Sequence, residues 1–204
     1  MDELLESHPS IEEARIDKKR RAFLQTASCV IGGVGAMCAL VPLGSSLLPS
    51  KRTEALAAPI EVDISTLASG QQMTVSWRGK PVWIIRRTPA MLEQLRHHPT
   101  TLRDPDSVAS EQPESAKNEY RSIHPEYLVL IGICTHLGCS PKYVPTLHEL
   151  GPDWDGGFYC PCHGSTFDLA GRVYQGVPAP INLEVPPYYF KTPTKIVIGE
   201  NTPS

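Results

Sequence analysis

At 204 residues, the chain has room for one domain of ordinary size or for a smaller domain with appendages. Its 20 prolines and 15 glycines favour a loop-rich architecture of short strands over a helical one. The net charge of -3 and the lack of a basic stripe interleaved with aromatic residues argue against nucleic-acid binding.

The N-terminus predicts a membrane anchor. The basic run Lys18–Arg21 is followed by a stretch without charged residues from Ala22 to Ser50. That stretch exceeds the roughly 20 apolar residues that cross a bilayer, and it is longer than the apolar core of a cleavable secretory signal. The paired Arg20 and Arg21 ahead of Phe23 resemble a twin-arginine export signal, which sends folded, cofactor-loaded proteins across the membrane. An ordinary membrane helix with positive flanking charges is the alternative interpretation.

Both interpretations divide the N-terminal segment in the same way. We expect residues 1–21 in the cytoplasm, an uncleaved transmembrane helix over residues 22–49 and a flexible tether over residues 50–58. Pro42 is expected to kink or end the helix near its outer side. Residues 59–204 would then form the exported body.

The exported body is expected to be all-β. Alternating apolar and polar residues predict strands at residues 59–64 and 72–77, and the second of these forms a hairpin with the apolar run 81–85. The nearly continuous apolar run 127–133 predicts a buried strand, and residues 195–198 predict a closing one. Because no helical pattern separates these last strands, the body is expected to be an antiparallel sandwich or a small barrel.

Two segments interrupt the strands. Thr88 and Pro89 predict the cap and first turn of a short helix that runs towards His98. His97 and His98 have no cysteine or carboxylate cluster beside them, so we interpret them as surface histidines rather than a metal site. Residues 100–121 are polar and broken by prolines, and we expect them to be a surface excursion.

Two short cysteine–histidine boxes carry the chemistry. They are Cys134-Thr135-His136-Leu137-Gly138-Cys139 and Cys160-Pro161-Cys162-His163-Gly164-Ser165. Two cysteines and two histidines suit a tetrahedral zinc site, but they equally suit a two-iron cluster in which histidines replace cysteines on one iron. One cysteine of each box would be left over, and in an exported domain such a pair is expected to form a disulfide.

The two boxes resemble those of the Rieske iron–sulfur proteins of cytochrome bc1 complexes, the ubiquinol–cytochrome c reductases. The resemblance continues through Phe167-Asp168, Gly171-Arg172-Val173 and residues 176–183, and with the anchor and tether it covers most of the chain. It implies a Rieske-type antiparallel β sandwich with a small cluster-binding subdomain at about residues 131–184. It also implies one 2Fe-2S cluster as the cofactor.

The resemblance assigns roles to individual residues. Cys134 and Cys160 would bind the inner iron, His136 and His163 the outer iron, and Cys139 and Cys162 would form a disulfide. Residues 176–180 would be a proline-rich loop over the third side of the cluster. Around the cluster it places Leu137, Gly138, Gly164, Ser165, Phe167 and Pro178. Leu137 is expected to be an exposed apolar contact at the tip.

The same resemblance implies the activity and its setting. His163 would take a hydrogen bond from quinol bound in cytochrome b, and the cluster would accept an electron together with a proton. The tethered head would then move to cytochrome c1, within a dimeric complex that contributes to proton translocation. We expect a single-pass protein of the bacterial inner membrane, with its N-terminus cytoplasmic and its Rieske domain periplasmic. A zinc-stabilised binding domain and a ferredoxin-like carrier for an oxygenase are the alternatives.

Phe167 departs from the family pattern. Many members have a tyrosine here, whose hydroxyl donates a hydrogen bond to a ligand sulfur. Donors to the sulfurs stabilise the more negative, reduced state, so their loss lowers the reduction potential. The sequence therefore predicts a potential below the top of the family's range.

Overall fold

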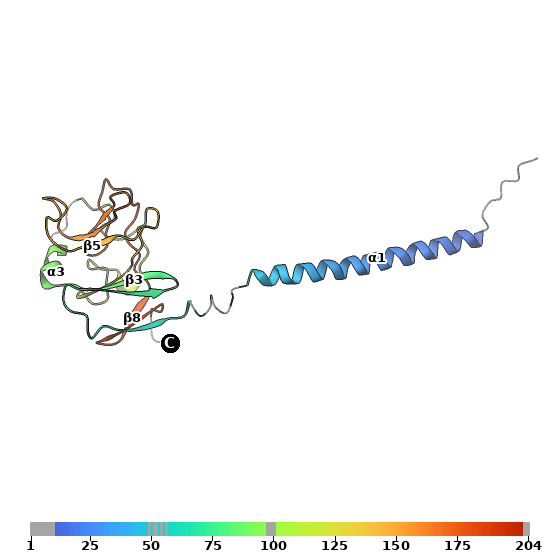
Figure 1. The fold of residues 1–204 in the computed structure, drawn as a ribbon, viewed down its shortest axis with the longest axis horizontal. Helices are drawn as coiled ribbons and strands as arrows, with labels where there is room; N and C mark the ends of the chain where they lie inside the picture. Colours follow the sequence, from blue (N-terminus) through green and yellow to red (C-terminus); the bar gives the residue numbers. More distant parts are fainter. Residues whose placement is uncertain are drawn as a thin grey trace, which may run out of the picture. The chain divides into compact units, whose positions relative to one another are not determined.

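The computed structural model describes residues 11–48, 50, 53, 55, 57–96 and 101–201. The chain divides into two units, residues 1–51 and 52–204. Figure 1 shows a long N-terminal helix in the first unit and a body of short strands in the second. The expectation of an all-β body preceded by one N-terminal apolar helix is confirmed.

The N-terminal unit is the helix α1, Ile11–Ser46. Its segment Asp17–Ser46 is long and apolar enough to cross a membrane, and it is the one such helix among the residues described. The helix starts before the expected anchor, since lysine, arginine and glutamate are good helix formers, and it ends at Ser46. It continues through Pro42 for one more turn, in which the Ser45 hydroxyl donates to the Pro42 carbonyl.

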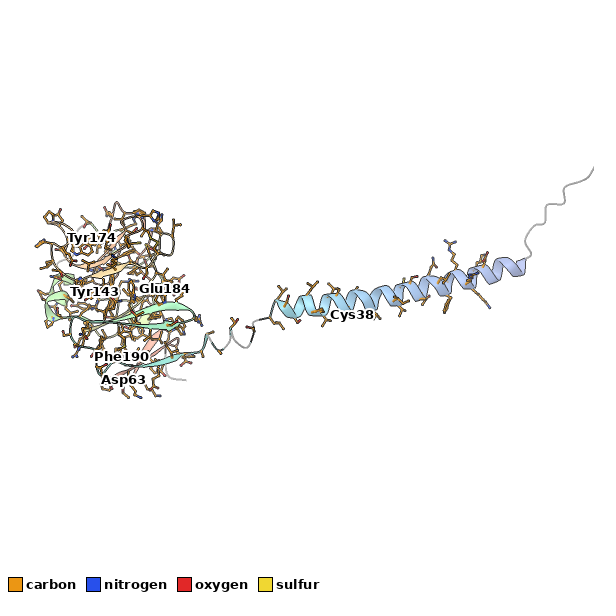
Figure 2. All side chains as sticks on the ribbon, viewed as in Figure 1. Cys38, Asp63, Tyr143, Tyr174, Glu184 and Phe190 are labelled. Carbon is orange, nitrogen blue, oxygen red and sulfur yellow. A yellow bond between two sulfur atoms is a disulfide. The ribbon has the colours of Figure 1, made fainter. Side chains whose placement is uncertain are left out.

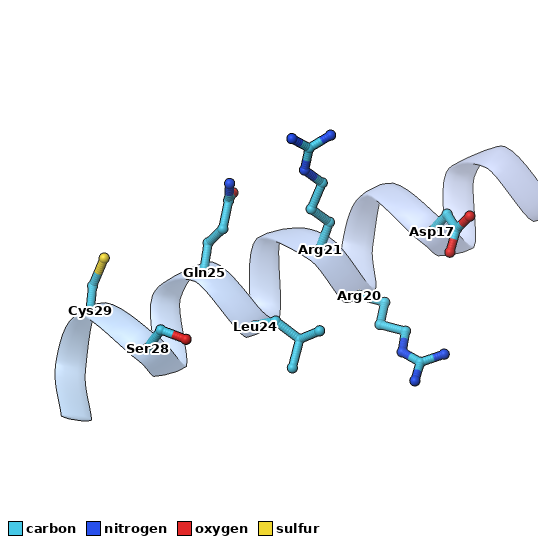
Figure 3. A pocket seen from close by; sticks show the side chains of 7 residues that line it. All are labelled: Asp17, Arg20, Arg21, Leu24, Gln25, Ser28 and Cys29. Atoms are coloured by element: carbon cyan, nitrogen blue, oxygen red, sulfur yellow. The ribbon is translucent and has the colours of Figure 1, made fainter. Parts of the chain in front are cut away.

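The paired arginines lie on the N-terminal half of α1. Figure 3 shows Arg20 and Arg21 projecting from opposite sides of the helix, with Gln25 and Cys29 following Arg21 at four-residue spacing. All four side chains are exposed along the helix, so its surface is available to a bilayer or to other helices.

Part of the expected tether lies outside the described residues. Of the residues that are described, Thr53, Ala55 and Ala57 are helical, and the Ala58 amide donates to the Ala55 carbonyl. The flexibility of residues 50–58 stays a prediction.

Two antiparallel sheets of three strands form the base of the body. One has the order β1 (Ile60–Asp63), β9 (Lys195–Ile198) and β8 (Tyr188–Thr192), and the other has β2 (Gln72–Trp77), β3 (Lys80–Arg86) and β4 (Tyr127–Ile131). Arg78 and Gly79 join β2 to β3 with φ values of 52° and 72°. Positive φ at both central residues suits a two-residue hairpin, because that turn matches the twist of the strands.

A third antiparallel sheet carries the two boxes. It consists of β5 (Lys142–Val144), β6 (Gly157–Tyr159) and β7 (Thr166–Phe167). Gly157 has no room for a side chain, because a Cβ on it would collide with the backbone of Phe167 and Asp168. The apolar residues of β3 and β4 share one core with Cys134, Phe158, Cys160 and Phe167, so the sheet with the boxes is seated on the base.

Two short helices lie among the strands. The helix α3 (Pro89–Arg96) is capped by Thr88, whose hydroxyl accepts a hydrogen bond of 3.2 Å from the Met91 amide, as the sequence predicts. The 3-10 helix η1 (Glu114–Ala116) lies in the segment between α3 and β4. His97 and His98 lie outside the described residues.

Residues 101–121, which we call the strap, lie at the surface as expected, with most of their residues exposed. The strap is nevertheless attached to the body, because Leu102, Ser107, Ala116 and Arg121 are buried. The strap packs on the body because its polar groups bond to the chain beneath them, with the Arg121 guanidinium donating to carbonyls of residues 170, 171 and 183. Burial lowers the pKa of Arg121 to about 10, yet it remains a cation at neutral pH.

Candidate metal centre

The two boxes have the same backbone geometry. In the first, the Cys134 amide donates to the Cys139 carbonyl, and the Gly138 amide donates to the Cys134 carbonyl. In the second, Cys160 bonds to Ser165 and Gly164 to Cys160 in the same pattern. Each box is thus a six-residue loop closed on itself, and it projects from the sheet of β5, β6 and β7.

A glycine makes each loop possible. Gly138 and Gly164 have φ values of 83° and 75°, in the left-handed region that side chains disfavour. Nothing lies within 4 Å of where a Cβ would stand on either residue. The need for glycine is therefore conformational rather than steric.

The four predicted ligand residues approach one another as two pairs, Cys134 with Cys160 and His136 with His163. Cys134 and Cys160 are free cysteines, each 2% exposed. His136 is half-buried and His163 is exposed, and their ring centroids lie 4.7 Å apart with the ring planes at 83°. Two thiols therefore lie inside the protein and two imidazoles lie towards its surface.

These side chains fit a metal cluster. The Nδ1 atom of His136 is buried and has no hydrogen-bond partner, and buried polar atoms normally have one. Burial raises the pKa of the Cys134 thiol, and the nearby Cys160 thiol raises it further. A metal would displace that proton, because the ligand form of cysteine is the thiolate.

The remaining two cysteines of the boxes form a disulfide between Cys139 and Cys162, with their Cα atoms 6.7 Å apart. This is the pairing that the resemblance implied. The sulfurs of Cys139, Cys160 and Cys162 lie within 4.8 Å of one another. Since two of these three sulfurs are bonded together, the disulfide leaves Cys160 as the free thiol of that group.

The proline-rich loop, residues 176–180, is bonded to the second box, and the residue after it is bonded to the first. The Ala179 amide donates a hydrogen bond of 3.0 Å to the hydroxyl of the fully buried Ser165. The Thr135 hydroxyl donates to the Ile181 carbonyl at 2.6 Å. Both boxes are therefore hydrogen-bonded to residues 176–181. Pro178, at the tip of the loop, is exposed.

Leu137 and Phe167 lie at opposite extremes of exposure. Leu137 is 72% exposed at the tip of the first loop. Phe167 is fully buried in β7, opposite Phe158 of β6. Phe158 in turn stacks on Trp83 at a centroid distance of 5.4 Å. Phe167 therefore brings an apolar ring to the base of the second box, with no donor for a sulfur.

The turn after β7 supports the site, and the local residue pattern did not predict this role. The buried Asp168 carboxylate accepts hydrogen bonds from the Ala170 and Arg172 amides, and from the Arg172 guanidinium at 2.6 Å. Asn182, also buried, accepts from the Val173 amide at 2.8 Å. These residues fix both ends of the segment that carries the proline-rich loop. Apart from the resemblance, their only local signal was the glycine of Gly171-Arg172.

The site and the fold define a class of protein, the Rieske-type iron–sulfur proteins. The family described as "Rieske [2Fe-2S] domain" matches residues 61–187. The cofactor is therefore one 2Fe-2S cluster, and the zinc interpretation is wrong. A second family, described as "Ubiquitinol-cytochrome C reductase Fe-S subunit TAT signal", matches residues 12–50.

Curated relatives show to which family within this class of protein the chain belongs. The "Ubiquinol-cytochrome c reductase iron-sulfur subunit" of Allochromatium vinosum is 53% identical over 91% of this chain and 91% of its own. That of Bradyrhizobium diazoefficiens is 46% identical over 88% of this chain and 94% of its own. A solved chain titled "Hyperthermophilic respiratory Complex III" is 28% identical, covering 86% of this chain and 98% of that one, with a TM-score of 0.46. The chain belongs to the family of ubiquinol–cytochrome c reductase iron–sulfur subunits.

Proposed function

We propose that the chain is the membrane-anchored redox subunit of a quinol–cytochrome c reductase, with Cys134, His136, Cys160 and His163 as the cluster ligands. The observation that carries the proposal is the arrangement of two buried thiols and two outward imidazoles on paired loops. Family membership supports the same activity, and the apolar helix α1 with its export signal supports a membrane-anchored bacterial subunit.

The buried thiols and the outward imidazoles would bind different iron atoms. The thiolates of Cys134 and Cys160 would hold the inner iron, and the imidazoles of His136 and His163 the outer one. When bound, the cluster supplies one-electron chemistry at a raised potential, because neutral imidazole donates less charge than thiolate. Burial of the thiols excludes water from their sulfurs, and the disulfide holds the two loops together.

The imidazole of His163 would contact the quinol. Bound through one ring nitrogen, it would have the other nitrogen at the surface. Once that nitrogen has lost its hydrogen, it could accept the hydrogen bond of a quinol hydroxyl and then its proton. The exposed side chain of Leu137 would be buried against cytochrome b when the head docks. His136 and Leu137 lie in the same loop, so docking would also cover the second imidazole.

The anchor would set the orientation. Lys18–Arg21 lie near the N-terminal end of α1, and positive charges flanking a membrane helix favour the cytoplasmic side. The head would then lie in the periplasm, where a disulfide persists. Cytochrome b and cytochrome c1 are the proposed partners, in a dimeric complex.

The ligand assignment is tested on the purified full-length chain. The wild type is expected to be coloured and to give the reduced-state EPR signal of a mixed His/Cys cluster. His136→Ala and His163→Ala should each abolish that signal, because each removes a ligand. His124→Ala, which removes a histidine packed against Phe190 in the base, is the control and should keep it. A mixed His/Cys signal that survives in either His136→Ala or His163→Ala would overturn the assignment.

A further inference from the structure

The first residues of the strap pair with the chain that leads into the proline-rich loop. The Arg103 amide donates to the Val173 carbonyl at 2.9 Å, and the Gln175 amide donates to the Thr101 carbonyl at 2.7 Å. Leu102, which lies between them, is buried and forms a bridge with Tyr174. The backbone at Arg103 is therefore fixed relative to the start of the loop.

The Arg103 side chain donates two hydrogen bonds to the middle of that loop. One terminal nitrogen of its guanidinium donates to the Ala179 carbonyl at 3.0 Å, and the other donates to the Val177 carbonyl at 3.0 Å. These two carbonyls flank Pro178. Prolines 178 and 180 have no amide hydrogen, so the loop has few backbone donors with which to stabilise itself. A charged donor from outside the loop takes their place.

The peptide groups of Ala179 connect the Arg103 guanidinium to the metal centre. Its carbonyl accepts from Arg103, and its amide donates to the Ser165 hydroxyl at 3.0 Å. Ser165 is fully buried in the second box, where its carbonyl accepts a hydrogen bond from the Cys160 amide at 2.8 Å. A hydroxyl has one hydrogen to donate; with a lone pair engaged by Ala179, that hydrogen would be left for the cluster.

We propose that Arg103 is a positioning residue for the metal centre, which holds Ala179 in place so that the Ser165 hydroxyl keeps its position in the second box and can donate its hydrogen to a sulfur of the cluster. The inference rests on the proposed function, because it concerns a donor to the ligand set. Residues further along the strap hold the other end of the loop: the Asn182 side chain donates to the Asp104 carbonyl at 2.8 Å, and its amide donates to the Ser110 hydroxyl at 3.0 Å.

The test compares Arg103→Ala and Arg103→Lys in the purified full-length chain. The first readout is the midpoint potential of the cluster, followed by EPR during a redox titration. Arg103→Ala should lower the potential, because a donor to sulfur that is less well placed stabilises the reduced state less. The second readout is hydrogen exchange of the peptide that contains Ala179, which should quicken about tenfold or more when the charged hydrogen bonds are lost.

Two controls separate positioning from charge. Arg103→Lys keeps the positive charge, but a single ammonium does not reproduce a planar fork across two carbonyls, so it should also lower the potential and quicken exchange. Lys117→Ala removes a positive charge from the strap at a residue paired with Glu114, and it should change neither readout. A wild-type potential in Arg103→Lys would show that charge alone acts, and would overturn the proposal.

A double-mutant cycle with Ser165→Ala tests the route. If Arg103 acts through Ser165, adding Arg103→Ala to Ser165→Ala should shift the potential no further. An undiminished second shift, or no effect of Arg103→Ala on either readout, would overturn the proposal. Failure of the proposed function is distinguishable, since the wild type would then lack the mixed His/Cys signal while hydrogen exchange would still report on the Arg103 contacts.

Discussion

Phe167 is expected to lower the reduction potential of the cluster, because it stands where many relatives have a tyrosine. It is fully buried at the base of the second box, and its ring has no group that donates to a sulfur. Ser165, two residues earlier, has a hydroxyl that can donate to a sulfur. The site therefore has one of the two side-chain donors that many members of the family have.

Phe167→Tyr is expected to raise the midpoint potential. The added hydroxyl would supply a second hydrogen bond to sulfur and so stabilise the reduced state. The measurement is a redox titration of the full-length chain followed by EPR. Ser165→Ala is the companion variant and should shift the potential the other way. An unchanged or lower value in Phe167→Tyr would contradict the prediction.

Single residues differ in how far the sequence could predict them. Cys134 and His136 lie close together in one box and Cys160 and His163 in another, so the spacing within the two boxes together suggests a metal site. Arg103 meets its partners, Val177 and Ala179, across 74 and 76 residues. An exposed arginine in a polar segment has no local pattern that marks such a contact, so the sequence did not predict its role.

Among the elements, the sheet of β1, β9 and β8 contains a small charge cluster. Glu61 of β1 accepts hydrogen bonds from Lys191 of β8 at 2.6 Å and from Lys195 of β9 at 2.7 Å. These lysines lower the pKa of Glu61 from its ordinary 4.5 to about 2. Figure 2 shows this end of the body beside the label of Asp63, the last residue of β1.

Glu61→Gln should make the chain less sensitive to acid. A carboxylate with a lowered pKa contributes stability that is fully present above its unfolded value of 4.5 and is lost as the pH falls towards about 2. The variant should therefore melt below the wild type at pH 7, and the difference should shrink through that window. Thermal unfolding by circular dichroism measures it. Glu114→Gln, an acid paired with Lys117 alone, is the control, and equal slopes for Glu61→Gln and the wild type would contradict the prediction.

Elements with a repeating pattern were predicted better than the strap. The alternation of β2 marks one buried face, and the apolar runs in β3 and β4 mark strands covered on both faces, so their positions followed from hydrophobicity. In the strap, polarity suggested solvent. Its polar groups instead bond to the chain: the Asp104 carboxylate accepts from the Val108 and Ala109 amides and from the Ser110 hydroxyl. Composition does not distinguish these two uses of a polar residue.

At the scale of the whole molecule, the segment between the anchor and the head should control turnover without tuning the metal centre. We expect Ala55→Pro with Ala57→Pro to slow quinol oxidation several-fold in the assembled complex, because proline-rich linkers are stiff. The midpoint potential should stay unchanged, since no contact with the boxes is altered. Ala55→Ser with Ala57→Ser is the control. Unaffected turnover in the proline variant would contradict a moving head.

The disulfide between Cys139 and Cys162 also dictates an order of assembly. Twin-arginine signals export proteins that are already folded, and a disulfide does not persist in a reducing cytoplasm. We therefore expect the cluster to be inserted while both cysteines are still thiols. Oxidation of this pair after export would then leave Cys160 as the free thiol among three sulfurs that lie within 4.8 Å of one another in the folded chain.

Blocking export should yield the chain at the stage before the disulfide forms. Arg20→Lys with Arg21→Lys is expected to retain a chain that carries the cluster and has all 6 of its cysteines as thiols after denaturation. The exported chain should have only those of Cys29, Cys38, Cys134 and Cys160. Alkylation followed by mass spectrometry counts them. A retained chain without a cluster would mean that maturation waits for the oxidised compartment.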